Sequence, residues 1–111
     1  MTIDNVGTFL QVKDIEGHCM VIRLTHRVLW NGEPAKILEI ARKPEGSFEC
    51  YIGDPEHGGL HISGDNLLML LMTRLDRNVA KEYAALFNEL HNRKYFETLV
   101  KSKPIFRFEC V

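Results

Sequence analysis

Apolar and polar residues alternate through much of the first half of the chain, with the two-residue period of half-buried strands. Residues 18–25 (HCMVIRLT) are rich in aliphatic and β-branched side chains and are typical of a strand. Residues 47–52 (SFECYI) alternate strictly, and residues 6–12 (VGTFLQV) predict an earlier strand. The pattern therefore predicts a β-rich N-terminal half.

The strongest local signal is the pair Asn31-Gly32, because both residue types accept the positive φ values of a type I′ turn. It predicts a hairpin between residues 27–30 and 34–42. Pro34 has no amide hydrogen, which places it at the start of its strand or on an edge. A second turn is expected at residues 43–46 (KPEG). The hairpin and the strand after it resemble small SH3-like half barrels in their spacing.

The pattern changes to helical periodicity after residue 65. Residues 66–75 (NLLMLLMTRL) are apolar all around a helix, so this helix must be covered on most sides. Asp65 or Ser63 is expected as its N-cap. Asp76 is expected to cap a second helix, whose apolar stripe is Val79, Tyr83, Leu86, Phe87 and Leu90.

Asn92 is expected to separate this second helix from a third at residues 93–101, and Pro104 ends the helical region. Alternation returns in residues 105–111 (IFRFECV), with Phe106, Phe108 and Cys110 on one face. We therefore expect one α+β domain over residues 1–111. It has a small bent antiparallel sheet in sequence order, two to three helices and a returning C-terminal strand.

Composition agrees with a single globular domain of 111 residues, with 45% hydrophobic and 26% charged residues. The longest apolar run, residues 67–72, is far shorter than the roughly 18 residues of a membrane-spanning helix, so no membrane association is expected. No signal peptide is visible in the first ten residues. The three cysteines are widely spaced, which predicts free, buried thiols and a cytoplasmic location.

The formal net charge of −1 argues against general binding to nucleic acid. The charge is uneven along the chain. Residues 1–65 hold ten acids and six bases, and residues 66–111 hold five acids and eight bases.

The segment DPEHGGLHISGD, residues 54–65, contains His57 and His61 among acidic residues and glycines. Imidazole and carboxylate at short spacing suit zinc, so a metal-dependent hydrolase using Asp54, His57 and His61 is one alternative. Gly58 and Gly59 argue against a helix that would place both histidines on one face. We therefore expect a polar loop leading into a short strand, and assign no metal or cofactor.

Arg23 and Arg27 have the R-x-x-x-R spacing that resembles the first half of the cyclic-dinucleotide motif of PilZ domains. The second half does not match, because His61 and Asn66 occupy its acid or amide position and its glycine position. The PilZ assignment is rejected. A second alternative is an oligomeric binder of a small phosphorylated, nucleotide-type ligand, or a protein that sequesters such a signal. Its site would combine Arg23, Arg27, Trp30, His57 and His61.

The apolar run offers a surface for self-association, because one small sheet does not cover a helix without a polar face. The expected interface residues of a homodimer are Leu67, Leu68, Met69, Leu71 and Met72.

The main functional expectation is a small, non-catalytic cytosolic protein that binds a protein partner as a regulator, adaptor or inhibitor. The serine elbow, Walker loop, G-x-G-x-x-G and H-E-x-x-H motifs are all missing from the sequence. Trp30, next to the hairpin turn, is a residue type enriched in interface hot spots. Small domains of this kind recur among phage and mobile-element proteins, which is an association only.

Overall fold

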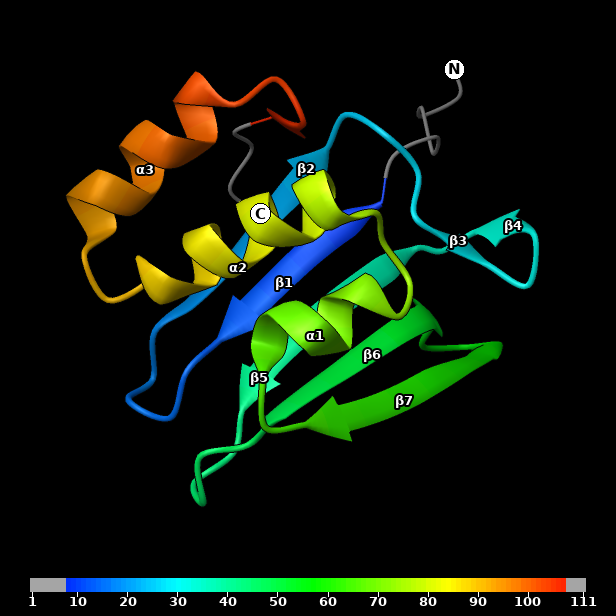
Figure 1. The fold of residues 1–111 in the computed structure, drawn as a ribbon. Coiled ribbons are helices and arrows are strands. Elements are labelled where there is room, and N and C mark those ends of the chain that lie inside the picture. The colour runs from blue at the N-terminus through cyan, green and yellow to red at the C-terminus, as the bar shows by residue number, and fades with distance from the viewer. Residues whose placement is uncertain (1–7, 108–111) are drawn as a thin grey trace.

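The computed structural model describes residues 8–107, which form an open, bent sheet with helices on one face (Figure 1). The main sheet has the strand order β7-β6-β5-β1-β2-β8. Its strands are β1 (Phe9–Lys13), β2 (Cys19–Leu24), β5 (Ile37–Arg42), β6 (Phe48–Asp54), β7 (Gly58–Gly64) and β8 (Phe106–Arg107). A separate hairpin joins β3 (Leu29–Trp30) to β4 (Glu33–Pro34). The helices are α1 (Leu67–Met72), α2 (Arg77–Asn88) and α3 (Arg93–Ser102).

The sheet is mixed, so the expectation of antiparallel strands in sequence order is wrong. β1 lies between β2 and β5, antiparallel to β2 and parallel to β5. The chain reaches this arrangement through residues 25–36, here called the crossover segment, which leave β2 and pass the start of β1. The sheet is unclosed, and its topology does not confirm the SH3-like half barrel.

Thr8 fastens the crossover segment to the sheet. Its side chain is fully buried, and its hydroxyl donates to the Ala35 carbonyl at 2.8 Å and accepts from the Val28 amide at 2.9 Å. The Ala35 amide donates to the Val28 carbonyl, which closes the base of the β3–β4 hairpin. The predicted strand over residues 34–42 is divided here because the chain changes partners, from β3 to the main sheet.

The hydrophobic core lies between the sheet and the helices. Residues of β1, β2, β5 and β6 alternate between buried and half-buried positions, as the sequence pattern predicts. Tyr83 of α2 is fully buried and stacks near Phe106 of β8, and Phe87 meets Phe48 of β6 edge-on. The opposite face of the sheet, here called the outer face, carries no helix among the described residues (Figure 1).

Side-chain caps begin the helices. Asp76 accepts from the Val79 amide, as expected. Asn92, expected only to separate α2 from α3, also caps α3 by accepting from the Tyr95 amide. The N-cap of α1 is Asn66, not Asp65 or Ser63. Because β7 continues through residues 63 and 64, α1 starts later than the sequence predicts.

The polar loop expected in residues 54–65 is a short turn, and the strand expected after it is β7, Gly58–Gly64. Glycine in this segment serves close backbone approach within a strand pair. A Cβ on Gly59 would lie 2.4 Å from the Ile52 carbonyl oxygen and 2.8 Å from the Tyr51 ring. Gly59, one of the two glycines that argue against a helix, therefore allows the close approach of β7 to β6.

The turn predicted at Asn31-Gly32 is confirmed, with φ values of 53° and 80°. β8 pairs with β2 through Phe106 opposite Leu24, while Phe108 and Cys110 of the expected C-terminal strand lie outside the described residues. In the described range, no helix has the length and apolar character needed to cross a membrane.

Candidate functional site

The turn between β6 and β7 is held by the carboxylate of Asp54. Its Oδ1 accepts from the Glu56 amide at 2.9 Å, and its Oδ2 lies 2.8 Å from His57 Nδ1. The Tyr51 hydroxyl donates to the Asp54 carbonyl at 3.0 Å. The turn is therefore stabilised through both the side chain and the backbone carbonyl of Asp54.

The same contacts lower the pKa of Asp54 to about 2. The largest cause is the hydrogen bond from the Glu56 backbone, followed by His57 and the charge of Lys36, whose Nζ lies 3.5 Å from Oδ2. Asp54 therefore keeps its negative charge at every physiological pH.

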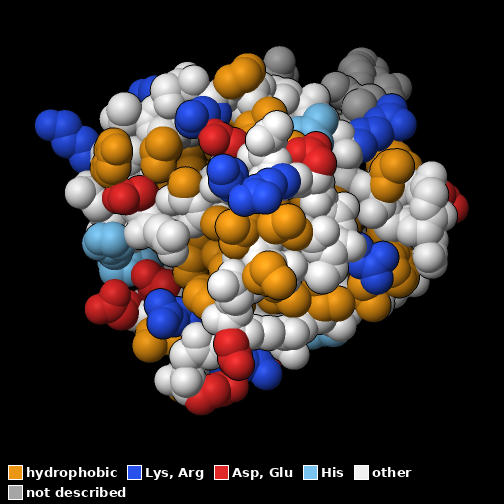
Figure 2. All heavy atoms as spheres, viewed as in Figure 1, with side chains coloured by type: hydrophobic (Ala, Val, Ile, Leu, Met, Phe, Trp, Pro, Cys, Tyr) orange, Lys and Arg blue, Asp and Glu red, His pale blue; other side chains and the backbone are white. Residues whose placement is uncertain are grey.

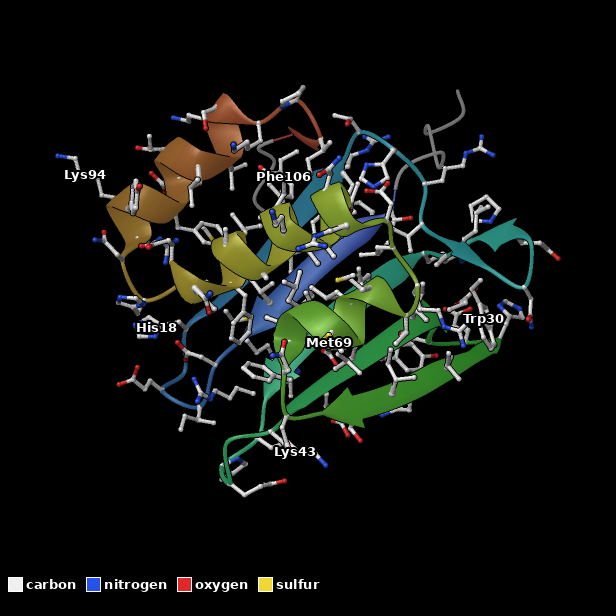
Figure 3. All side chains as sticks on the ribbon, viewed as in Figure 1. His18, Trp30, Lys43, Met69, Lys94 and Phe106 are labelled. Atoms are coloured by element: carbon white, nitrogen blue, oxygen red, sulfur yellow. The ribbon has the colours of Figure 1, made fainter. Side chains whose placement is uncertain are left out.

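A hollow with a volume of about 320 Å³ lies between this turn and the β3–β4 hairpin. In Figure 3, the label of Trp30 beside the end of the β6–β7 hairpin shows where this hollow lies. Trp30 is half-buried and packs partly against the core. We call this cavity the Trp30 hollow. It is lined by Trp30, Asn31, Glu33, Pro34, Ala35, Gly53, Asp54, His57 and Gly58.

A second hollow of about 350 Å³ lies on the other side of Asp54 and has mainly apolar walls. Its residues Phe9, Val21 and Ile37 come from β1, β2 and β5, and Phe9 is 37% exposed. Lys36, Asp54, Pro55 and Glu56 complete its lining. We call this cavity the Phe9 hollow. Because Asp54 lines both cavities, the two hollows meet at the same fixed turn.

Of the predicted ligand-binding residues, the structure brings Trp30 and His57 into one hollow. Arg23 is on β2 opposite Phe9, next to the Phe9 hollow in strand register. Arg27 lines a different cavity, of about 250 Å³, together with Arg74. The two arginines therefore do not line the Trp30 hollow, and a site for a phosphorylated ligand made of all five predicted residues is not assembled.

His61 lies on the outer face, paired with Tyr51 across β6 and β7. Its ring centroid is 5.3 Å from that of Tyr51, and its Nδ1 is 3.4 Å from Glu49 Oε2. His57 instead faces Asp54. The two histidines thus have separate carboxylate partners, which gives no support to the metal-dependent hydrolase.

A group that sequence reasoning missed lies in the β1–β2 turn. The ligand atoms of Asp14, Glu16 and His18 lie within 4.8 Å of one another. Asp14 Oδ1 accepts from the amides of Glu16 and His18, and its Oδ2 is 2.7 Å from His18 Nδ1. Asp54 makes the same kinds of contact in its own turn. Both turns contain an aspartate followed by a glutamate and a histidine, in D-I-E-G-H and D-P-E-H, and this repeated pattern is the sequence signal that would have revealed the group. The contacts of Asp14 with Glu16 and His18 stabilise the turn itself.

The predicted interface residues on α1 separate into two sets. Leu67 and Leu71 are only 6% and 2% exposed, so their assignment to an interface is corrected: they belong to the core. Leu68 is half-buried, while Met69 is 64% exposed and Met72 37%. Figure 2 shows this hydrophobic area over α1, bordered by Lys and Arg side chains. Self-association through these three residues stays a prediction.

The thiols differ in environment. Cys50 is buried, and burial raises its pKa to about 12, so it is not a ready nucleophile. Cys19 is exposed, which corrects the expectation that it is buried. Cys110 lies outside the described residues.

His26 is a further residue whose environment the sequence did not reveal. Its Nε2 lies 2.9 Å from the Tyr83 hydroxyl, and its buried Nδ1 has no hydrogen-bond partner in the described range. Burial lowers the pKa of His26, and the charge of Asp76 acts in the opposite direction.

No protein-family model, curated protein or solved structure matches this chain.

Proposed function

We propose that this protein is a non-catalytic binding protein that docks a protein partner at the Trp30 and Phe9 hollows. The observation that carries the proposal is that two hollows of different chemistry meet at one fixed turn, where they share Asp54. A surface that is already shaped before binding loses little conformational entropy when a partner docks.

The composition of this surface supports a protein partner. Trp30 and Phe9 offer aromatic area, and tryptophan is prominent among interface hot spots. Glu33, Asp54 and Glu56 supply polar groups around the apolar parts. Apolar anchors surrounded by polar groups are the usual anatomy of a protein interface.

The phosphorylated-ligand alternative is the weaker proposal because Glu33 and Asp54 place two carboxylates in the Trp30 hollow. They would repel a phosphate. Cytosolic location, a regulator, adaptor or inhibitor role and a phage or mobile-element origin remain expectations. A homodimer through Leu68, Met69 and Met72 is a separate expectation.

Site-specific photo-crosslinking in the cells that make the protein tests the proposal. A benzophenone amino acid replaces Pro34 or Pro55, both exposed beside the hollows, and matched controls replace exposed Pro44 or Thr98 elsewhere. We expect positions 34 and 55 to give the same crosslinked protein, with no such product from 44 or 98. No product from 34 and 55, or equal products from all four positions, would contradict the proposed docking surface.

A further inference from the structure

The charges of the Trp30 hollow are all of one sign apart from its histidine. Glu33 and Asp54 are its acidic residues, and no Lys or Arg belongs to its lining within the described range. The low pKa of Asp54 keeps that carboxylate ionised in any physiological buffer. A partner group that enters this hollow meets the carboxylates of Glu33 and Asp54.

One of the two carboxylates has no counter-charge within residues 8–107. Asp54 is close to His57 and Lys36, with its Oδ2 2.8 Å from His57 Nδ1 and 3.5 Å from Lys36 Nζ. Lys36 lines the Phe9 hollow, not the Trp30 hollow, and its side chain is 67% exposed. The exposed Glu33 carboxylate makes no ion pair or hydrogen bond with the described part of the chain.

Trp30 adds a second source of attraction for positive charge. The face of an indole ring carries negative quadrupole potential, and tryptophan is the best aromatic partner for a Lys or Arg head group. Trp30 is held in place because it packs partly against the core and because its hairpin is closed by the Asn31-Gly32 turn.

We propose that the Trp30 hollow binds the side chain of a lysine or arginine from the protein partner, between Trp30 and the Glu33 carboxylate. The neighbouring Phe9 hollow binds an apolar side chain of the same partner segment. This inference rests on the proposed function and adds the chemistry of the partner: a segment with one basic and one apolar residue on the same face.

A random peptide-display selection against the whole protein tests this inference, because the peptide library samples basic and apolar residues in every arrangement. Peptides that also bind Trp30→Ala or Glu33→Lys are removed, and circular dichroism first establishes that both variants fold. We expect the remaining peptides to share a Lys or Arg and a nearby apolar residue. Surviving peptides without a basic residue would overturn the cation assignment and leave the docking surface standing. If no peptide distinguishes the wild-type protein from both variants, the docking surface fails as well.

The affinity of one selected arginine peptide then measures the charge effect. Trp30 is the only tryptophan in the chain, so its fluorescence reports binding at this hollow. We expect about a tenfold loss of affinity when citrulline, the neutral analogue, replaces arginine, and a similar loss with Glu33→Gln. Glu45→Gln, on an exposed turn away from both hollows, is the matched control and leaves the affinity unchanged. Equal affinity of the arginine and citrulline peptides would overturn the assignment.

Sedimentation velocity of the protein alone tests whether a second copy of this chain, and not a different protein, occupies the Trp30 hollow. We expect Glu33→Lys to leave the association state of the protein unchanged. Self-association that Glu33→Lys abolishes would mean that a second copy supplies the basic side chain, and the proposed partner would be wrong.

Discussion

The Tyr83 hydroxyl lies 2.9 Å from Nε2 of His26 and so links α2 to the crossover segment that carries Trp30. Tyr83 is fully buried, and burial raises the pKa of its hydroxyl, so it stays neutral. The other imidazole nitrogen, Nδ1, is buried without a partner among the described residues. Folding therefore favours the neutral form of His26.

The first prediction concerns pH. The pKa of His26 is lowered by burial from its ordinary value of 6.5, and Asp76 only partly opposes this. Below pH 6.5 the unfolded chain therefore takes up a proton before the folded chain does, and stability falls until the folded pKa is reached. Urea unfolding of wild type and His26→Gln between pH 7.5 and 5 checks this prediction. We expect the variant to lose less stability over this range, and equal losses would contradict the assignment.

The second prediction is that Thr8→Val destabilises the protein. Valine has nearly the shape of threonine but leaves the Ala35 carbonyl and the Val28 amide without their partner. Each buried unsatisfied group costs about 1–3 kcal/mol, which urea unfolding measures. Thr98→Val, on the exposed surface of α3, is the matched control with a small effect. A small effect of Thr8→Val as well would show that the crossover segment is held by other contacts.

The third prediction compares two glycines of β7. An alanine at 59 places its Cβ 2.4 Å from the Ile52 carbonyl oxygen, whereas one at 64 meets Leu70 Cδ1 at an ordinary 3.6 Å. We expect Gly59→Ala to destabilise by about 1–3 kcal/mol and Gly64→Ala to have little effect. Chemical denaturation of both variants provides the comparison. Equal stabilities would show that the β6–β7 pair relaxes without cost.

The fourth prediction separates core from surface on α1. Leu71 is 2% exposed, so Leu71→Ala should cost about 2–5 kcal/mol of unfolding free energy. Met69 is 64% exposed, so Met69→Ala should change the unfolding free energy of the monomer by no more than about 0.5 kcal/mol. Unfolding at several protein concentrations also tests self-association, since a dimer interface at Met69 makes the midpoint depend on concentration.

The fifth prediction concerns the turn carboxylate. The pKa of Asp54 is about 2, below its ordinary value of 3.8. The stability that this group contributes is present above pH 3.8 and is lost as pH falls through 2. The ¹³C chemical shift of its carboxyl carbon, followed by NMR, should titrate near pH 2 in the folded protein. A midpoint near the ordinary value would mean that the contacts with Glu56 and His57 are not maintained in solution.

Several local features were predictable because the residues that decide them are close together in the chain. The Asn31-Gly32 turn needs positive φ at both positions, and the cap Asp76 accepts from the amide three residues ahead. The alternation in β2 and β6 and the apolar stripe of α2 likewise follow from the period of each element.

The candidate site could be predicted only in part. Trp30 and His57 were identified separately, from a turn position and from a histidine-rich segment. Their shared hollow also needs Glu33 and Asp54, which no sequence motif connects to Trp30. The interface assignment of Leu67 and Leu71 failed for a related reason, since hydrophobicity alone does not distinguish a side chain covered by the core from one left outside.

The sequence by itself determined the turns, the N-cap of α2 and the apolar face of each main element, because these depend on dihedral preferences and hydrogen bonds within a few residues. The tertiary structure alone decided that β5 lies parallel to β1, that Thr8 holds residues 25–36 and that two hollows share Asp54. These outcomes depend on contacts between residues far apart in the chain. Such contacts form only where all the packing constraints of the core are satisfied together.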